Sequence, residues 1–87
     1  MNIEFPTVEA WDSDGDKVTF PADSDGKRIV CAISWEALTD HFGADRGDDP
    51  IEAFRNNRAV IEQAAEKKIL AGHTEDDGSI LLYTAEF

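Results

Sequence analysis

The stretch "RIVCAISWEALTDHF", from Arg28 to Phe42, joins a strand to a helix and decides the fold of this chain. Its first half alternates β-branched and apolar residues, which predicts a central strand buried on both faces. Ser34 is a suitable N-cap for the second half, in which Trp35 and Leu38 share one helical face with the final phenylalanine. A β-to-α junction is therefore expected at Ser34.

Three Asp-Gly pairs mark turns around this junction. They are Asp14-Gly15, Asp25-Gly26 and Asp77-Gly78. Such pairs favour hairpin turns, because glycine accepts a positive φ and aspartate tolerates it. The residues beside these pairs predict an amphipathic strand at Lys17–Phe20 and a long C-terminal strand at Ser79–Phe87.

The stretch "DPIE", from Asp49 to Glu52, predicts the start of a second helix. Asp49 is the expected N-cap, Pro50 takes the first helical position, and Glu52 follows three residues after the cap. The helical pattern continues to about Ala71, and Gly72 supplies the stop.

These elements predict one α+β domain over residues 1–87, with the order β-β-β-α-α-β. The N-terminal hairpins and the C-terminal strand form a small antiparallel sheet, and two helices pack on one of its faces. The side chains expected to fill the core are Trp11, Phe20, Ile29, Cys31, Ile33, Trp35, Leu38, Phe42, Phe54, Ile61, Ile80, Leu82 and Phe87.

The chain is strongly acidic. Nineteen Asp and Glu against eight Lys and Arg give a net charge of −11, which repels phosphate backbones and anionic lipid at long range. The single cysteine excludes an intrachain disulfide, and no apolar run suits a signal peptide or a membrane span. We therefore expect a cytoplasmic protein that binds neither nucleic acid nor membrane.

Two Asp-rich stretches, "WDSDGD" at Trp11–Asp16 and "DSDG" at Asp23–Gly26, invite comparison with calcium loops. Counted from Asp12, the position that needs glycine is Lys17, and the position that needs glutamate is a shorter aspartate. We interpret both stretches as turns and predict no metal and no cofactor. The alternative is that the clustered aspartates hold a divalent ion weakly.

Nucleophilic catalysis is not favoured. Cys31 lies in the most apolar strand, where a thiol behaves as an inert small hydrophobe, so its pairing with His41 as nucleophile and base is not expected. Ser34, His41 and Asp45 are the residue types of a catalytic Ser-His-Asp triad. Ser34, however, is already expected to serve as a helix cap. No catalytic residue is predicted.

The second helix carries polar residues on or beside its apolar face: Asn57, Arg58 and Lys68. In a structural interpretation, the cations lay their stems on the core and meet carboxylates such as Glu62, four residues after Arg58. In a functional interpretation, the side chains face a partner or an anion between the two helices. The candidate binding residues are Arg55, Asn57, Arg58 and Lys68, with Trp35 and His41 on the wall of the groove.

"CAISWEALTDHFGA" and "DPIEAFRNNRAVIEQAAEKKILAG" resemble a small bacterial family, domain of unknown function 1488. The resemblance covers nearly the whole chain, and most of its motif consists of core and cap residues. The residues that carry it are Phe5, Pro6, Trp11, Cys31, Ile33, Ser34, Phe42, Gly43, Phe54 and Arg58. It implies a small α+β domain without an assigned catalytic activity.

Two functions therefore remain open from the sequence. The first is a non-enzymatic binding, adaptor or regulatory module that uses the surface of the helix pair to bind a protein or small molecule. The second is a metal-dependent or small-molecule-binding protein or enzyme that uses the Asp-rich turns.

Overall fold

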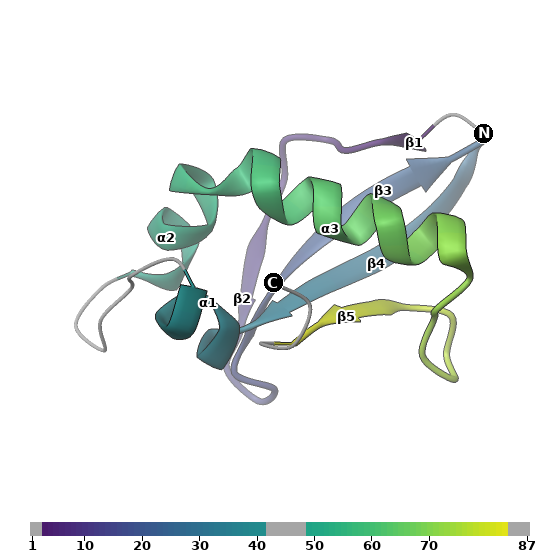
Figure 1. Ribbon diagram of the computed structural model, residues 1–87. Helices are drawn as coiled ribbons and strands as arrows, with labels where there is room; N and C mark the ends of the chain where they lie inside the picture. Colours follow the sequence, from purple (N-terminus) through teal and green to yellow (C-terminus); the bar gives the residue numbers. More distant parts are fainter. Residues whose placement is uncertain (1–2, 42–48, 84–87) are drawn as a thin grey trace.

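The computed structural model describes residues 3–41 and 49–83 of the chain. Within these residues, five strands form one sheet and three helices accompany it (Figure 1). In chain order the elements are β1 (Ile3–Glu4), β2 (Ala10–Asp12), β3 (Lys17–Ser24), β4 (Lys27–Ser34), α1 (Trp35–His41), α2 (Pro50–Asn56), α3 (Arg58–Ala71) and β5 (Ile80–Leu82). The α+β prediction is confirmed.

The β3–β4 hairpin is the centre of the sheet. Its eight-residue strands pair from Lys17 and Ser34 to Ser24 and Lys27. The turn between them is Asp25-Gly26, with φ values of 51° and 86°. Both residues thus have the positive φ that the Asp-Gly signal predicts for a tight hairpin turn.

On one side of β3, the edge strand is split into β1 and β2. Glu4 pairs with Asp23 and Ala10 pairs with Thr19, so residues 5–9 arch past the shorter span 20–22. Pro21 lies in this span and has no backbone N–H, so the arch leaves no donor unpaired at that residue. The arch turns Glu9 toward the helices.

On the other side of the hairpin, β5 pairs with β4 in parallel, at Cys31–Ile33. The sheet is therefore mixed, which corrects the expectation of a purely antiparallel one. The reason is topological: three helices lie between β4 and β5 and return the chain to the end of the sheet from which β4 started. Strand β5 is also shorter than predicted, and residues 84–87 lie outside the described part of the chain.

All three helices cover the same face of the sheet (Figure 1). Their caps follow the sequence signals: the Ser34 hydroxyl accepts the Ala37 N–H at 3.1 Å, and the Asp49 carboxylate accepts the Ile51 N–H at 3.0 Å. Gly72 ends α3 in the left-handed conformation, with φ 73°. The predicted second helix is broken at Asn57 into α2 and α3, so the described chain has three helices instead of two.

The core lies between the sheet and the helices. Its buried side chains are Val18, Phe20, Ala22, Cys31, Ile33, Ala37, Leu38, Ala53, Phe54, Ile61, Ala65, Ile80 and Leu82. Trp11, expected inside, remains 37% exposed because it lies on the short edge strand β2. Val30 is 54% exposed, which corrects the expectation that both faces of β4 are buried, since none of the helices in the described residues covers the second face. Phe42 and Phe87 lie outside the described residues.

Candidate functional site

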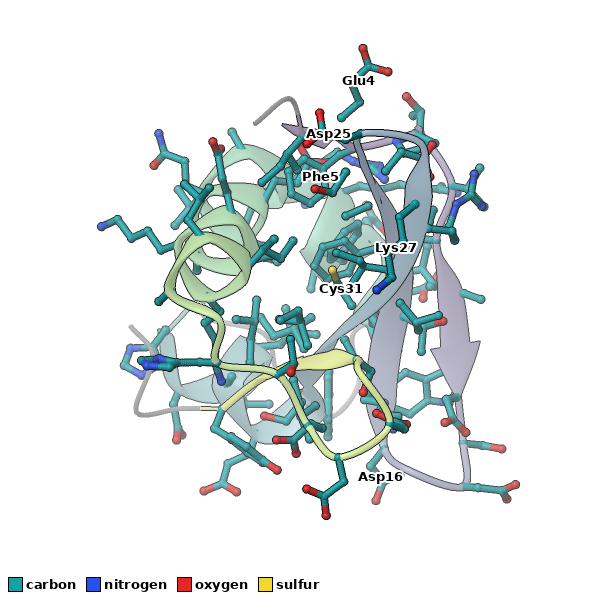
Figure 2. The ribbon with its side chains drawn as sticks, turned by 90° about the vertical axis from the view of Figure 1, so that its right-hand side faces the viewer. Glu4, Phe5, Asp16, Asp25, Lys27 and Cys31 are labelled. Carbon is teal, nitrogen blue, oxygen red and sulfur yellow. The ribbon has the colours of Figure 1, made fainter. Side chains whose placement is uncertain are left out.

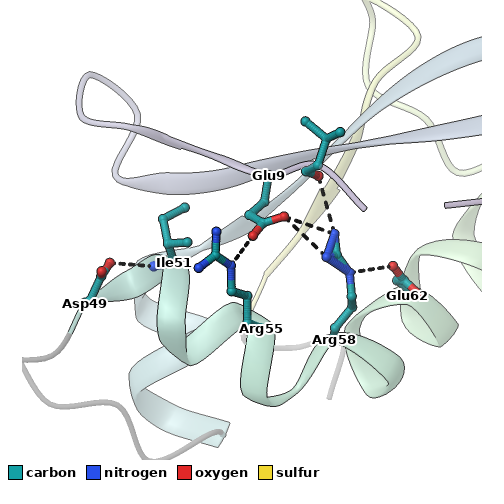
Figure 3. Close-up of polar contacts among 7 residues, drawn as sticks. Glu9, Asp49, Ile51, Arg55, Arg58 and Glu62 are labelled. Carbon is teal, nitrogen blue, oxygen red and sulfur yellow. Dashed lines mark hydrogen bonds and ion pairs between the residues drawn. The ribbon is translucent and has the colours of Figure 1, made fainter. Parts of the chain in front are cut away.

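A carboxylate from the arch meets two arginines at the junction of α2 and α3 (Figure 3). The Glu9 side chain is only 5% exposed. Its Oε1 accepts a hydrogen bond from Arg55 Nε, and its Oε2 lies 3.3 Å from both terminal nitrogens of Arg58. Each oxygen of one buried carboxylate is therefore bound by a different guanidinium.

Arg58 is bound through all three of its nitrogens. Besides its contacts with Glu9, its Nε donates to Glu62 at 3.1 Å and one terminal nitrogen donates to the Val8 carbonyl at 3.4 Å. The guanidinium also lies over the Phe54 ring, 5.0 Å from the centroid. Because only 19% of its side chain is exposed, Arg58 is held as part of the fold, and the ion pair with Glu62 predicted from the spacing is present.

Arg55 differs from Arg58 in its exposure. Its side chain is 65% exposed and bonds Glu9 through Nε alone. Within the described residues, the two terminal nitrogens of Arg55 make no hydrogen bond. The bond to Glu9 raises the pKa of Arg55, so the group stays fully charged. The result is an oriented guanidinium whose fork of donors faces solvent.

Asn57 shapes the junction. Its side-chain amide donates to the Ala53 carbonyl at 2.9 Å, and its backbone N–H donates to the Phe54 carbonyl at 3.1 Å. These bonds end α2, while the Asn57 carbonyl accepts the first bond of α3, from Ile61 N–H. The helix break thus presents Arg55 and Arg58 to the same carboxylate.

The remaining candidate residues lie elsewhere. Lys68 is about three helical turns from Arg58, roughly 15 Å along the axis. Its ammonium donates to the Leu81 carbonyl at 2.8 Å and lies over the Tyr83 ring. Trp35 begins α1 and packs edge to face on Trp11, with ring centroids 6.2 Å apart. His41 is exposed at the end of α1.

The Asp-rich stretches form turns. Asp12 Oδ1 accepts the backbone N–H groups of Asp14 and Gly15 at 3.1 and 3.3 Å, which is an Asx turn. Asp16 and Asp25 take positive φ values in the two hairpin turns. Among the described residues, no group of three or more His, Cys, Asp or Glu side chains is arranged to hold a metal ion.

Cys31 is fully buried in the core. Burial raises the pKa of its thiol to about 12, so the thiolate that a nucleophile requires does not form at neutral pH. Ser34 is committed as the α1 cap, as predicted. No helix in the described part of the chain has the length and apolar character needed to cross a bilayer.

Sequence reasoning missed Glu9. The carboxylate lies on an irregular edge segment, and its partners follow 46 and 49 residues later. The signal that pointed toward it was indirect: Arg58 was placed within or at the edge of the apolar face of its helix, where a cation needs a carboxylate partner.

Known proteins resemble this chain in sequence over most of its length. The chain matches the family described as "Protein of unknown function (DUF1488)" over residues 3–82. Proteins called "Uncharacterized protein YrdB" from Escherichia coli (strain K12) and Shigella flexneri are 36% and 35% identical to it over 80 residues, which cover 92% of this chain and 94% of theirs.

A solved structure supports the same relationship. The crystal structure of a protein of unknown function of the same family, from Shewanella loihica PV-4, superposes with a TM-score of 0.82 at 29% identity and covers 94% of each chain. These likenesses place the chain among small α+β proteins found in bacteria. It belongs to the DUF1488 family, and the resemblance seen in its sequence is confirmed.

Proposed function

We propose that this chain is a non-catalytic binding module of the bacterial cytoplasm. It captures a partner protein or small molecule through the surface of the helices. Arg55, near the junction of α2 and α3, is the contacting residue. Arg58 and Asn57 hold that surface in shape. Trp35 and His41 on α1 and Lys68 near the end of α3 are not assigned a contact with the partner.

The two exposed terminal nitrogens of the Arg55 guanidinium are the main support for this proposal. An arginine held at Nε by a buried carboxylate loses little side-chain freedom on binding, because its direction is already set. Two terminal nitrogens that donate in parallel match the two oxygens of a carboxylate. The chemistry expected of the partner is therefore an exposed carboxylate.

The charge of the whole chain limits how this contact forms. A net charge of −11 opposes an acidic partner at long range, so attraction at Arg55 acts only within the screening length of about 8 Å at physiological salt. We expect slow association without electrostatic steering, and specificity that depends on close fit.

The experiment compares affinity capture from a lysate of the source organism by wild-type protein and by Arg55→Gln. The substitution removes the fork and leaves Glu9 bonded to Arg58. We expect the variant to remain folded by circular dichroism and to lose the partners that the wild type retains, as quantified by mass spectrometry.

Lys67→Gln is the matched control. Lys67 is another exposed cation on the helices, and its substitution also removes one positive charge. It should retain the wild-type set of partners. Identical captures by the wild type and Arg55→Gln would contradict the proposal.

A further inference from the structure

One half of β4 has an open edge. Strand β5 pairs only with Cys31–Ile33, so within the described chain no strand flanks Lys27–Val30 on that side. The loop at residues 74–79 stands opposite this edge and encloses a groove of about 850 Å³. Figure 2 looks onto the region, with Lys27 projecting from β4 on the side of the loop.

The open edge offers backbone hydrogen-bonding groups. In an antiparallel hairpin, alternate residues turn their N–H and C=O groups away from the partner strand. Counted from the closing pair Ser24 and Lys27, the outward residues of β4 are Arg28, Val30 and Ala32. Ala32 lies within the β5 pairing, whereas Arg28 and Val30 lie beyond it. Such an edge is a template for an added strand.

The opposite wall of the groove is already ordered. The Glu75 N–H donates to the Ser79 carbonyl and the Gly78 N–H to the Glu75 carbonyl, both at 2.8 Å. The Asp77 carboxylate accepts from the Ser79 N–H and hydroxyl, and the Tyr83 hydroxyl donates to Glu75. A ligand would therefore not have to order this loop, which reduces the entropic cost of binding.

The chemistry of the groove defines its occupant. Val30 is 54% exposed at the edge, and the loop contributes the carboxylates of Glu75, Asp76 and Asp77. Asp76 is exposed and makes no hydrogen bond or ion pair within the described residues. Arg28 is neutralised by Asp23 at 2.6 Å, which leaves Lys17 and Lys27 as the cations that line the groove with these acids. Lys17 is itself paired with Asp12 at 3.9 Å.

We propose that the free edge of β4 binds an extended basic peptide in which small apolar residues alternate with Lys or Arg. The peptide adds a strand beside Arg28 and Val30, places its apolar residues on Val30, and sets a cationic side chain against Asp76. The net charge of −11 steers such a peptide toward the chain. This surface is separate from Arg55 and does not depend on it.

The first test titrates the protein with a fluorescein-labelled eight-residue peptide of alternating valine and lysine. We expect saturable binding, at least about tenfold tighter than that of an alternating valine and glutamate peptide. Amide hydrogen exchange supplies a local readout: the Arg28 and Val30 amides should exchange rapidly in the free protein and at least about tenfold more slowly when bound.

Val30→Pro removes the outward N–H while keeping the bonds to β3, because Val30 faces Pro21 at a position without ladder bonds. It should bind the peptide about tenfold more weakly. Val30→Ala keeps the N–H but loses part of the apolar contact, so it should weaken binding less than Val30→Pro does. Asp76→Lys should weaken binding without affecting folding, and it supplies an independent test if the proline variant unfolds.

Three results would overturn the proposal. The first is non-saturable binding, and the second is equal affinity of the valine-lysine peptide for the wild type and a folded Val30→Pro. The third is protection of the Arg28 and Val30 amides in the free protein. If light scattering then showed a dimer, the occupant of the edge would be a second copy of the chain.

Discussion

The guanidinium of Arg58 lies over the ring of Phe54, 5.0 Å from its centroid. The ion pairs of Glu9, Arg55, Arg58 and Glu62 therefore adjoin the hydrophobic core. Phe54 is fully buried and also packs on Phe20, with ring centroids 5.0 Å apart. The polar and apolar parts of the junction are therefore expected to be coupled energetically.

That coupling is measurable with a double-mutant cycle of Phe54→Leu and Glu9→Gln. Both changes remove or alter a contact of the Arg58 guanidinium. Their effects on the free energy of unfolding should therefore be non-additive by at least about 0.5 kcal/mol. Ile80→Val on β5 is the control partner for Glu9→Gln, and that pair should be additive in urea denaturation. Equal coupling in both cycles would show that the cation–π contact is not the link.

Glu9→Gln and Glu62→Gln should differ in stability although both carboxylates bind Arg58. Loss of the Glu9 charge leaves Arg58 largely buried without its main counter-ion, and we expect a cost of about 2 kcal/mol. The pKa of Glu62 is raised by its partial burial, against the attraction of Arg58, so its charged form is not favoured by folding. Glu62→Gln should therefore change stability by less than about 1 kcal/mol. Urea denaturation at neutral pH measures both, and the reverse order would contradict the assignment.

Cys31 should resist thiol reagents in the native protein. At pH 8 its reaction with a chromogenic disulfide should proceed only through unfolding and become fast in denaturant. Because burial raises the pKa of the folded thiol to about 12, the unfolded chain loses this proton first as the pH rises from about 9. The contribution of Cys31 to the free energy of unfolding should therefore decrease as the pH rises from about 9 to about 12. In Cys31→Ala, the free energy of unfolding should decrease less over this alkaline range. Rapid native labelling would contradict the burial.

Ser79→Ala should raise the pKa of Asp77. Hydrogen bonds from the Ser79 hydroxyl and backbone N–H hold the pKa of this carboxyl below its usual range. The lowered pKa contributes stability to the loop above the ordinary value of 3.8, and that contribution is lost as the pH falls through the folded pKa. An NMR titration of the carboxyl carbon measures the shift, with Ser13→Ala as the control that leaves the pKa of Asp77 unchanged.

Local signals in the sequence predicted the parts of the fold that depend on neighbouring residues. The Asp25-Gly26 turn, the Ser34 and Asp49 caps and the Gly72 stop each rest on contacts within a few positions. Single-residue chemistry was sufficient there, because glycine, proline and short polar side chains have strong backbone preferences.

Features that depend on distant residues were missed. The parallel pairing of β5 is set by how three helices return the chain, and the exposure of Trp11 follows from its place on a short edge strand. The break at Asn57 was missed for a different reason: its amide bonds to Ala53, only four residues away, but helical periodicity does not reveal this bond. Of the candidate site, the pairing of Arg58 with Glu62 could be predicted from spacing, whereas the contacts of Glu9 could not.

The parallel pairing of β5 also bears on synthesis at the ribosome. The β3–β4 hairpin joins residues close in sequence and can form early, but Ile80 and Leu82 fill the core beside Cys31 and Ile33 only after all three helices have been made. A nascent chain that ends before Ile80 therefore exposes an uncovered apolar strand. Emergence of Ile80–Leu82 from the exit tunnel, and not translation of the hairpin, sets the moment at which this sheet can be completed.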